Sequence, residues 1–261
     1  MKKKVRILIS VILLAVFCFS GWKLFSIWQE YRVGEETYES IERYVVIPET
    51  TASEEPQEEQ TPEEESLQET EKSEILWPQV DFDALREINP DVVGWLYIEG
   101  TQINYPVLQG KDNDQYLYHM IDGTYNSAGS LFLQAGIQGD FFAPNNPVYG
   151  HNMKNGSMFA GLTGYKGQAF YEEHPVALLL TPEQNYQVRI FSAYVMDAGG
   201  DAWKTALKDS AMQDWLEERV DRSCLDTNVV PTAEDRILTL STCTYETENA
   251  RFLVHGILVP E

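Results

Sequence analysis

A cysteine and an arginine near the end of the chain occur in a pattern that predicts a reactive thiol. Cys243 ends the run Thr-Leu-Ser-Thr-Cys, and Arg251 opens the run Arg-Phe-Leu-Val-His-Gly eight residues later. Two alternating runs joined by a short polar stretch are typical of a β-hairpin with a longer loop. This hairpin would pair Cys243 with Arg251 and Ser241 with Leu253. Because a neighbouring cation favours the nucleophilic thiolate, the sequence predicts an activated cysteine at the rim of a sheet.

Both residues also have an ordinary structural interpretation. A free cysteine such as Cys243 is among the residues most often buried as a small hydrophobe. Arg251 could equally be a surface charge at a strand end, as most arginines are. A further residue that exchanges protons would favour the chemical interpretation.

Four histidines compete for this acid–base role. His151 follows a short apolar run and a glycine, in Pro-Val-Tyr-Gly-His-Asn-Met. His119 lies in a polar segment, and His174 precedes a proline. His255 lies inside the last strand-like run, opposite Thr239 in the hairpin, and is predicted to be a packed or surface strand residue. His151 is therefore a candidate for the acid–base group, and the residues alone leave the choice among the four histidines open.

The three runs together resemble the sortases of Gram-positive bacteria, class B most closely. They occur in the family's order and with family-like spacing, and the resemblance covers residues 80–261. Further stretches that fit the class B pattern lie at residues 105–109, 112–113 and 130–133. The resemblance implies a mostly β fold with added helices. It would be an eight-stranded β-barrel with N-terminal helices and a long helix before the cysteine strand.

The resemblance also implies roles for individual residues. Cys243 would be the nucleophile, His151 the acid–base group, and Arg251 the group that holds the substrate and stabilises the oxyanion. Four further residues are expected to bind substrate: Ser241, Glu246, Asn113 and Leu131. Glu246 would either pair with Arg251 or face solvent. The implied chemistry needs no metal or cofactor, and no convincing acidic cluster for calcium is seen in the folded domain.

The implied activity is that of a cysteine transpeptidase. It would cleave a C-terminal sorting signal after threonine and join the surface protein to a cell-wall precursor amine of the lipid II type, through a thioacyl-enzyme. Within the family, polymerisation of pilins is an alternative. A cysteine protease that releases peptide to water is another, and a wall-binding module that has lost catalysis is a third. The intact set of Cys243, His151 and Arg251 argues against the last of these.

Eight short apolar runs, separated by Gly, Pro and Asn, are typical of strands in a barrel or sandwich. They span residues 92–98, 105–108, 130–133, 147–149, 177–180, 186–194, 236–243 and 252–259. A short helix is expected over residues 81–88, and one or two more within 158–171. Apolar residues at three- and four-residue steps predict a longer helix over 201–222. Trp203 in this helix is expected to pack in the core.

The N-terminal region predicts a membrane anchor followed by a linker. Four basic residues lie before an apolar run at residues 7–28, which is long enough to span a membrane. The basic flank predicts a cytoplasmic N-terminus and an extracellular catalytic domain. A cleaved signal peptide is the alternative. We therefore expect an anchor over residues 1–30, a disordered acidic linker over 31–76, whose first part could extend the helix, and a catalytic domain over 77–261.

Charge and cysteine content exclude two further classes. The formal net charge is −22, and residues 49–74 supply much of it. This balance argues against a nucleic-acid partner, since phosphate binding needs clustered Lys and Arg. The three cysteines, Cys18, Cys224 and Cys243, do not form a disulfide framework or a zinc motif. A bridge between Cys224 and Cys243 is an open alternative, and it would remove the nucleophile.

Overall fold

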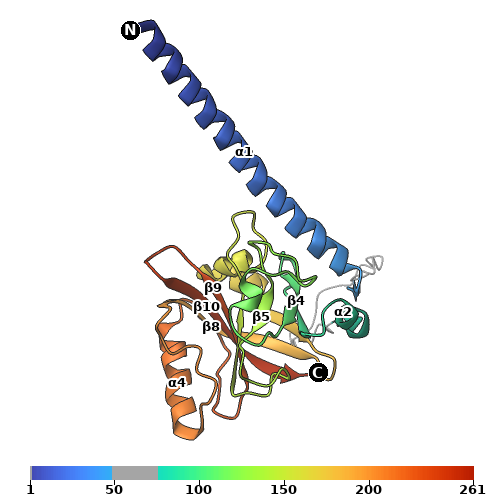
Figure 1. The fold of residues 1–261 in the computed structure, drawn as a ribbon. Coiled ribbons are helices and arrows are strands. Elements are labelled where there is room, and N and C mark those ends of the chain that lie inside the picture. The colour runs from blue at the N-terminus through green and yellow to red at the C-terminus, as the bar shows by residue number, and fades with distance from the viewer. Residues whose placement is uncertain (1, 49–75) are drawn as a thin grey trace, which may run out of the picture.

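Eight strands close into a mixed β-barrel (Figure 1). The computed structural model describes residues 2–48 and 76–261. Around the barrel the strand order is β10-β8-β7-β3-β4-β5-β6-β9. The strands are β3 (Val92–Tyr97), β4 (Asn104–Leu108), β5 (Leu131–Leu133), β6 (Asn145–Tyr149), β7 (Val176–Leu180), β8 (Tyr186–Asp197), β9 (Ile237–Cys243) and β10 (Ala250–Pro260). All eight strands predicted from the sequence are present, and they form a barrel rather than a sandwich.

Two of the strand pairings are parallel, and they determine which strand ends lie together at the rim of the barrel. β4 runs parallel to β5, and β6 runs parallel to β9. The other neighbours are antiparallel, including the long β9–β10 hairpin. Apolar side chains such as Trp95, Leu240 and Phe252 fill the interior and are at most 1% exposed. Their burial provides the main driving force for closing the barrel.

Short helices lie outside the barrel strands, and the sequence predicts all of them except the one at residues 115–117. α2 (Phe82–Ile88) begins at Asp81, whose carboxylate accepts a hydrogen bond from Ala84 N at 3.0 Å. This is the contact expected of an N-cap residue. Three further short helices follow: η1 (Gln115–Leu117), η2 (Phe159–Lys166) and α3 (Gln168–Glu173).

The helix before the cysteine strand is shorter than the sequence predicts. α4 (Asp209–Arg222) lies beside β8 (Figure 1), and residues 201–208 are not helical. The carbonyls of Ala202 and Lys204 accept hydrogen bonds from the side chain of Asn145 instead of from helical amides. The prediction of a helix from residue 201 was therefore wrong over its first two turns, because a side chain from a distant strand binds that backbone.

The N-terminal helix continues from the apolar segment onto the barrel. α1 (Lys2–Glu42) is a single helix of 41 residues that projects far from the barrel at its N-terminal end (Figure 1). Near its C-terminal end, Tyr38 and Ile41 are 7% and 4% exposed and belong to the same core as the barrel strands. The helix extends into the expected linker, as the sequence analysis allowed. The start of the linker at residue 31 is corrected, because residues 31–42 and 45–46 are helix and strand that pack on the catalytic domain.

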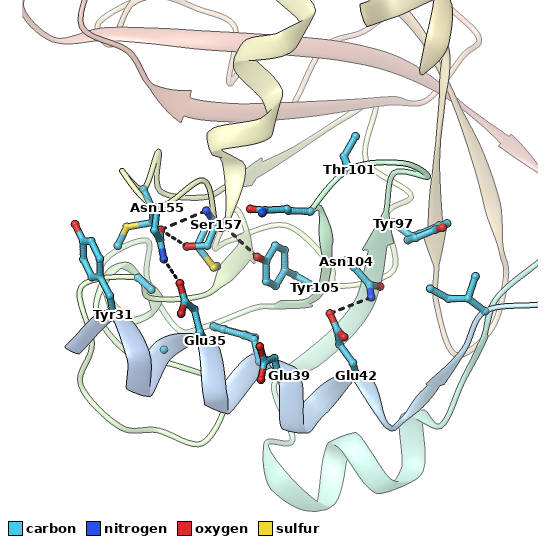
Figure 2. Close-up of a pocket in the computed structure, with 17 residues that line it drawn as sticks. Tyr31, Glu35, Glu39, Glu42, Tyr97, Thr101, Asn104, Tyr105, Asn155 and Ser157 are labelled. Carbon is cyan, nitrogen blue, oxygen red and sulfur yellow. Dashed lines mark hydrogen bonds between the residues drawn. The ribbon is translucent and has the colours of Figure 1, made fainter. Parts of the chain in front are cut away.

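Hydrogen bonds hold this part of α1 against the barrel. Tyr38 Oη donates to Gly129 O at 2.6 Å, and its ring packs edge-on against Tyr105. Figure 2 shows Glu35 and Glu42 reaching Asn155 and Asn104, at 2.8 and 3.4 Å. A cavity of about 500 Å³ remains between the helix and the barrel. We call this contact region the α1 collar; it consists of residues 30–42 and the barrel residues that they contact.

A two-stranded sheet follows the collar. β1 (Val45–Val46) pairs with β2 (Gln79–Val80) in antiparallel register. The pairing places residues 45–46 beside residues 79–80, although more than thirty residues separate them in the chain. Residues 49–75 of the linker expected over 31–76 lie outside the described residues. The β1–β2 pairing holds the end of α1 next to the start of the catalytic domain.

Candidate active site

The β9–β10 hairpin has the register that the sequence predicts. Cys243 pairs with Arg251, Ser241 with Leu253, and Thr239 with His255 in the same ladder. Side chains of residues directly opposite in an antiparallel pair lie on the same face, with Cβ atoms about 5 Å apart. The thiol and the guanidinium are therefore neighbours at the rim of the barrel.

The parallel pairing of β6 with β9 places a histidine at the same level. Tyr149 is opposite Ser241 in this ladder. Cys243 lies two residues further along β9, and His151 lies two residues beyond the end of β6. Two strands that run in the same direction therefore deliver the imidazole and the thiol to one edge.

Hydrogen bonds continue this pairing beyond the last ladder residues. Gly150 N donates to Ser241 O at 3.1 Å, and Thr242 Oγ1 donates to Gly150 O at 2.8 Å. Asn152 Nδ2 then donates to Cys243 O at 2.9 Å. The backbone on both sides of the thiol is thus fixed to the chain that carries the histidine.

Glycine is required just before the histidine. A Cβ atom on Gly150 would lie 2.4 Å from a methyl carbon of Leu131 and 2.7 Å from the ring of Phe159. Leu131 was expected to bind substrate, but its side chain is fully buried beneath this glycine. It does not line the cavity around the thiol. Its neighbour Phe132 lines the cavity instead, a residue that the sequence analysis missed.

The hydrogen bonding of His151 defines which ring nitrogen is available. Its Nε2 atom lies 2.7 Å from Leu117 O. A carbonyl oxygen can only accept, so Nε2 carries a hydrogen and Nδ1 remains for proton exchange. The ring also leans on Tyr118, with centroids 5.7 Å apart. These contacts hold the imidazole in one orientation.

A cavity of about 360 Å³ brings most of the predicted residues together. Five of them line it: Cys243, His151, Arg251, Ser241 and Asn113. Aromatic and aliphatic side chains complete the walls, including those of Leu117, Phe132, Tyr149 and Trp203. Small-molecule and peptide sites have this composition, an apolar cleft with a few convergent polar groups.

Backbone contacts restrain the polar groups at the cavity. Arg251 Nη1 donates to Ala250 O at 3.1 Å, which orients the guanidinium fork. Asn113 Oδ1 accepts from Ala135 N at 2.7 Å, so its amide nitrogen remains a donor for the cavity. Ser241 is only 2% exposed, and its hydroxyl accepts from Trp203 Nε1 at 3.2 Å. Trp203 was expected to be a core residue, and its position at the cavity was missed.

Glu246 lies away from the cavity. Its carboxylate pairs with Lys166 and accepts a hydrogen bond from Thr244. The Lys166 ammonium and the Thr244 hydroxyl lower the pKa of Glu246 to about 2. Of the two expected alternatives, the structure shows that Glu246 faces solvent and does not pair with Arg251; its ion pair with Lys166 was not expected.

The remaining cysteines and histidines are not at the cavity. Cys18, Cys224 and Cys243 are all free thiols, so the alternative of a Cys224–Cys243 bridge was wrong. Burial raises the pKa of Cys224, which makes it a weaker nucleophile. His255 is fully buried and bonded to Thr239, which confirms its prediction as a packed strand residue. Within residues 2–48 and 76–261, no group of three or more His, Cys, Asp or Glu could hold a metal ion.

Comparison with known proteins identifies the family. The family model described as the sortase domain matches residues 96–259. Sortase B of Listeria monocytogenes is 39% identical over 178 residues, which cover 67% of this chain and 72% of the relative. Sortase B of Staphylococcus aureus is 36% identical over 163 residues, 62% of this chain and 67% of the relative.

Solved structures show the same barrel. A crystal structure of S. aureus sortase B aligns with a TM-score of 0.66 and 33% identity, over 69% of this chain and 87% of that one. An S. aureus sortase B–substrate complex aligns with a TM-score of 0.66 and 34% identity, over 69% and 84%. Bacillus anthracis sortase B in complex with AAEK1 aligns with a TM-score of 0.71 and 29% identity, over 90% and 100%. The chain therefore belongs to the sortase family, and it is a sortase-type cysteine transpeptidase of class B.

Proposed function

We propose that this enzyme cleaves a C-terminal sorting signal after a threonine and transfers the acyl group to an amine of a cell-wall precursor of the lipid II type. The observation that carries the proposal is the cavity where the thiol of Cys243, the imidazole of His151 and the guanidinium of Arg251 meet. The solved complex of S. aureus sortase B with a substrate supports substrate binding by this fold. Its partners would be surface proteins that bear such a signal.

In the acylation half-reaction, the Cys243 thiolate attacks the carbonyl carbon of the threonine. The carbonyl electrons move onto oxygen, and the Arg251 guanidinium stabilises this oxyanion with planar, charged N–H donors. His151 then protonates the leaving amine through Nδ1, as the C–N bond breaks. The product is a thioester between Cys243 and the threonine acyl group.

In the second half-reaction, the acceptor amine attacks this thioester. His151, now neutral, takes a proton from the amine at the same Nδ1 atom. The C–S bond breaks, an amide forms and the Cys243 thiolate returns. Because Nε2 of His151 is occupied by Leu117 O, one nitrogen serves both proton transfers.

We further propose that α1 anchors the enzyme in the membrane as a single span with a cytoplasmic N-terminus. Over the part of the chain that the structure describes, α1 is the one helix long and apolar enough to cross a membrane. The side chains of its apolar half are exposed on all sides, as expected for contact with lipid. The basic residues before it favour the cytoplasmic side for the N-terminus.

A partitioning experiment tests the reaction. The enzyme is incubated with a fluorescent sorting peptide and increasing concentrations of a primary-amine acceptor such as triglycine, and the products are separated by mass. We expect the amide product to increase with amine concentration at the expense of the free acid. Release of only the free acid at every amine concentration would contradict transfer and indicate a hydrolytic cysteine protease.

A further inference from the structure

A loop with little charge lies beside α1 and carries two exposed tyrosines. Residues 118–128, which we call the tyrosine loop, connect η1 to β5. Asp122 is their one side chain among Asp, Glu, Lys and Arg, in a chain of net charge −22. Its carboxylate accepts hydrogen bonds from the amide and the hydroxyl of Thr124 at 2.9 and 2.6 Å. The loop therefore loses contact with water at a lower cost than most of this acidic protein.

The tyrosine loop runs along α1 toward the N-terminal end of the helix. Tyr38 of α1 donates to the carbonyl of Gly129, directly after the loop, at 2.6 Å. One turn earlier in α1, a Cβ atom on Gly34 would lie 3.4 Å from Asn126 Oδ1. A further turn earlier, Glu30 O accepts from Asn126 Nδ2 at 2.8 Å. Between residues 38 and 30 these contacts cover about 12 Å along the helix axis.

Tyr118 and Tyr125 form a stacked pair on the surface of the loop. The centroids of their rings are 5.9 Å apart, with an angle of 19° between the ring planes. Tyr118 is 45% exposed and Tyr125 is 70% exposed. Tyr125 directly precedes Asn126, so its backbone lies at the level of Glu30 in α1. Exposed aromatic rings that gather in a patch are typical of an interaction surface.

The apolar segment of α1 ends at the same level. It covers residues 7–28 and closes with Trp28, which is 53% exposed and whose ring lies 5.2 Å from the guanidinium of Arg32. Trp28 precedes Glu30 by two residues, which is about 3 Å along the helix axis. Tryptophan and tyrosine are enriched where a protein crosses the interface between lipid and water. A bilayer that α1 spans would therefore have its headgroup layer at the level of the tyrosine loop.

We propose that Tyr118 and Tyr125 form a second membrane contact, in which both rings lie in the headgroup layer of the bilayer that α1 spans. This inference rests on the proposed function, because it takes α1 to be a membrane anchor. The bilayer is the occupant that fits the patch, since the two rings continue the exposed aromatic side chains of α1 across the interface. The tyrosine loop also has little charge that would have to be removed from water.

This contact would fix how the thiol cavity faces the membrane. The ring of Tyr118 lies 5.7 Å from the ring of His151, and the carbonyl of the preceding Leu117 is bound to His151 Nε2 at 2.7 Å. The segment that orients the imidazole is thus continuous with the segment at the headgroup layer. An acceptor amine carried by a membrane lipid would reach the cavity from that layer. Tyr125 does not line the cavity, so it can be changed without altering the groups that act on the peptide.

Hydroxyl-radical footprinting of the unmodified full-length enzyme tests the contact directly. The protein is placed in nanodiscs of phosphatidylglycerol and phosphatidylcholine, and the oxidation of each aromatic side chain is corrected for its intrinsic reactivity. Phe142 is the reference, because it is 57% exposed and precedes β6, at the end of that strand opposite to His151. We expect Tyr118 and Tyr125 to lose most of their oxidation relative to Phe142. Oxidation of all three in proportion to their exposed fractions would overturn the proposal.

Transfer to a membrane-bound acceptor gives a second test. Tyr125→Asp places a charge in the proposed contact, and transfer of a sorting peptide is measured to soluble triglycine and to triglycine coupled to a lipid in the vesicles that hold the enzyme. We expect transfer to the lipid-bound acceptor to fall about fivefold, and transfer to the soluble acceptor to stay within about twofold. Tyr125→Trp should behave like the unmodified enzyme, since tryptophan also favours the interface. Val230→Asp is the matched control, at an 80% exposed position next to the apolar cluster that contains α4 residues. An equal change for the two acceptors in Tyr125→Asp would contradict the contact.

The outcomes separate this inference from the proposed function. If the enzyme does not float with lipid vesicles in a density gradient, the membrane anchor fails, and the second contact fails with it. If the enzyme floats but the two tyrosines are oxidised like Phe142, only the second contact fails. Protection that persists in detergent and rises with protein concentration would identify a second copy of this chain as the occupant, and protection that requires added wall glycan would identify glycan; either result would overturn the proposal. If no sorting peptide is transferred even to soluble triglycine, the proposed reaction fails, and the footprinting still decides the contact.

Discussion

The thiol cavity and the α1 collar both join segments that are distant in the chain, but different interactions hold them together. The cavity is set by backbone ladders, in which β9 is paired with β6 on one side and β10 on the other. The collar is set by side chains of one helix, chiefly Tyr38 and Ile41, against a finished barrel. Ladder register leaves little freedom for catalytic groups, whereas a side-chain contact can be weakened without changing the barrel. The two regions should therefore respond independently to mutation.

The largest effect is expected at the nucleophile. Cys243→Ala should abolish turnover of a sorting peptide, because no other described thiol lies at the cavity. Cys224→Ala should retain most activity, since the Cys224 thiol lies away from the cavity and contacts the backbone carbonyl of Tyr165. Peptide turnover on purified, folded proteins checks both. Full activity in Cys243→Ala would mean that the cavity is not the active site.

The next largest effect is expected at Arg251 and His151, the two groups that act with the thiol. Arg251→Lys keeps the charge but loses the planar fork, and activity should fall about ten- to a thousand-fold. His151→Ala should fall at least as far, because both half-reactions need a proton carrier. His119→Ala is the control, since His119 lies outside the cavity. The comparison uses kcat/KM with one peptide, and loss of activity in His119→Ala together with retention in His151→Ala would reverse the assignment.

A mutation in the α1 collar should lower stability and leave the catalytic rate unchanged. Ile41→Ala removes a side chain that is 4% exposed and should lower the free energy of unfolding by about 2–4 kcal/mol. Val46→Ala is the matched control, since Val46 is 64% exposed, and it should change stability by less than about 0.5 kcal/mol. Urea denaturation measures both, and turnover below the transition should be unchanged. A large loss of kcat in folded Ile41→Ala would show that the two regions are coupled.

The smallest effect is expected at the Glu246–Lys166 pair. The pKa of Glu246 is about 2 in the folded protein, below its ordinary value of 4.5. A lowered carboxyl pKa stabilises the fold above pH 4.5, and this stabilisation is lost as the pH falls through 2. Because both side chains are more than a third exposed, solvent screening limits the effect to less than about 1 kcal/mol. Glu246→Gln should therefore flatten the acid side of the stability profile slightly, and 1 M salt should have the same effect.

The thiol cavity and the α1 collar also differ in how far the sequence predicts them. The pairing of Cys243 with Arg251 was predictable because both residues belong to one hairpin, and the alternation of its strands sets the register. The resemblance to a known family supplied His151, whose strand is paired in parallel with β9 from nearly a hundred residues away. Trp203 was missed because its backbone is fixed by Asn145, and no local pattern shows that contact.

The collar was missed for a different reason. The sequence analysis allowed the helix to extend into this region but assigned the region to the linker, and it did not predict contacts such as the hydrogen bond that Glu35 accepts from Asn155. A signal was present: Tyr31, Gly34, Tyr38 and Ile41 recur at three- and four-residue steps, as on the buried face of a helix. Because the residues beyond 48 are strongly acidic, the sequence analysis began the linker at residue 31, which is too early in the chain. Composition alone cannot distinguish a linker from a polar helix whose single apolar stripe packs on a barrel.

Mass spectrometry of the intact enzyme tests the central claim most directly. The enzyme is mixed with a sorting peptide, quenched in acid within the first turnover and digested to locate the modification. We predict an added mass equal to the peptide up to and including its threonine, attached to Cys243 and removed when an amine acceptor is added before the quench. Turnover of the peptide without such an adduct, or with the adduct on Cys224, would contradict a thioacyl-enzyme at this cavity.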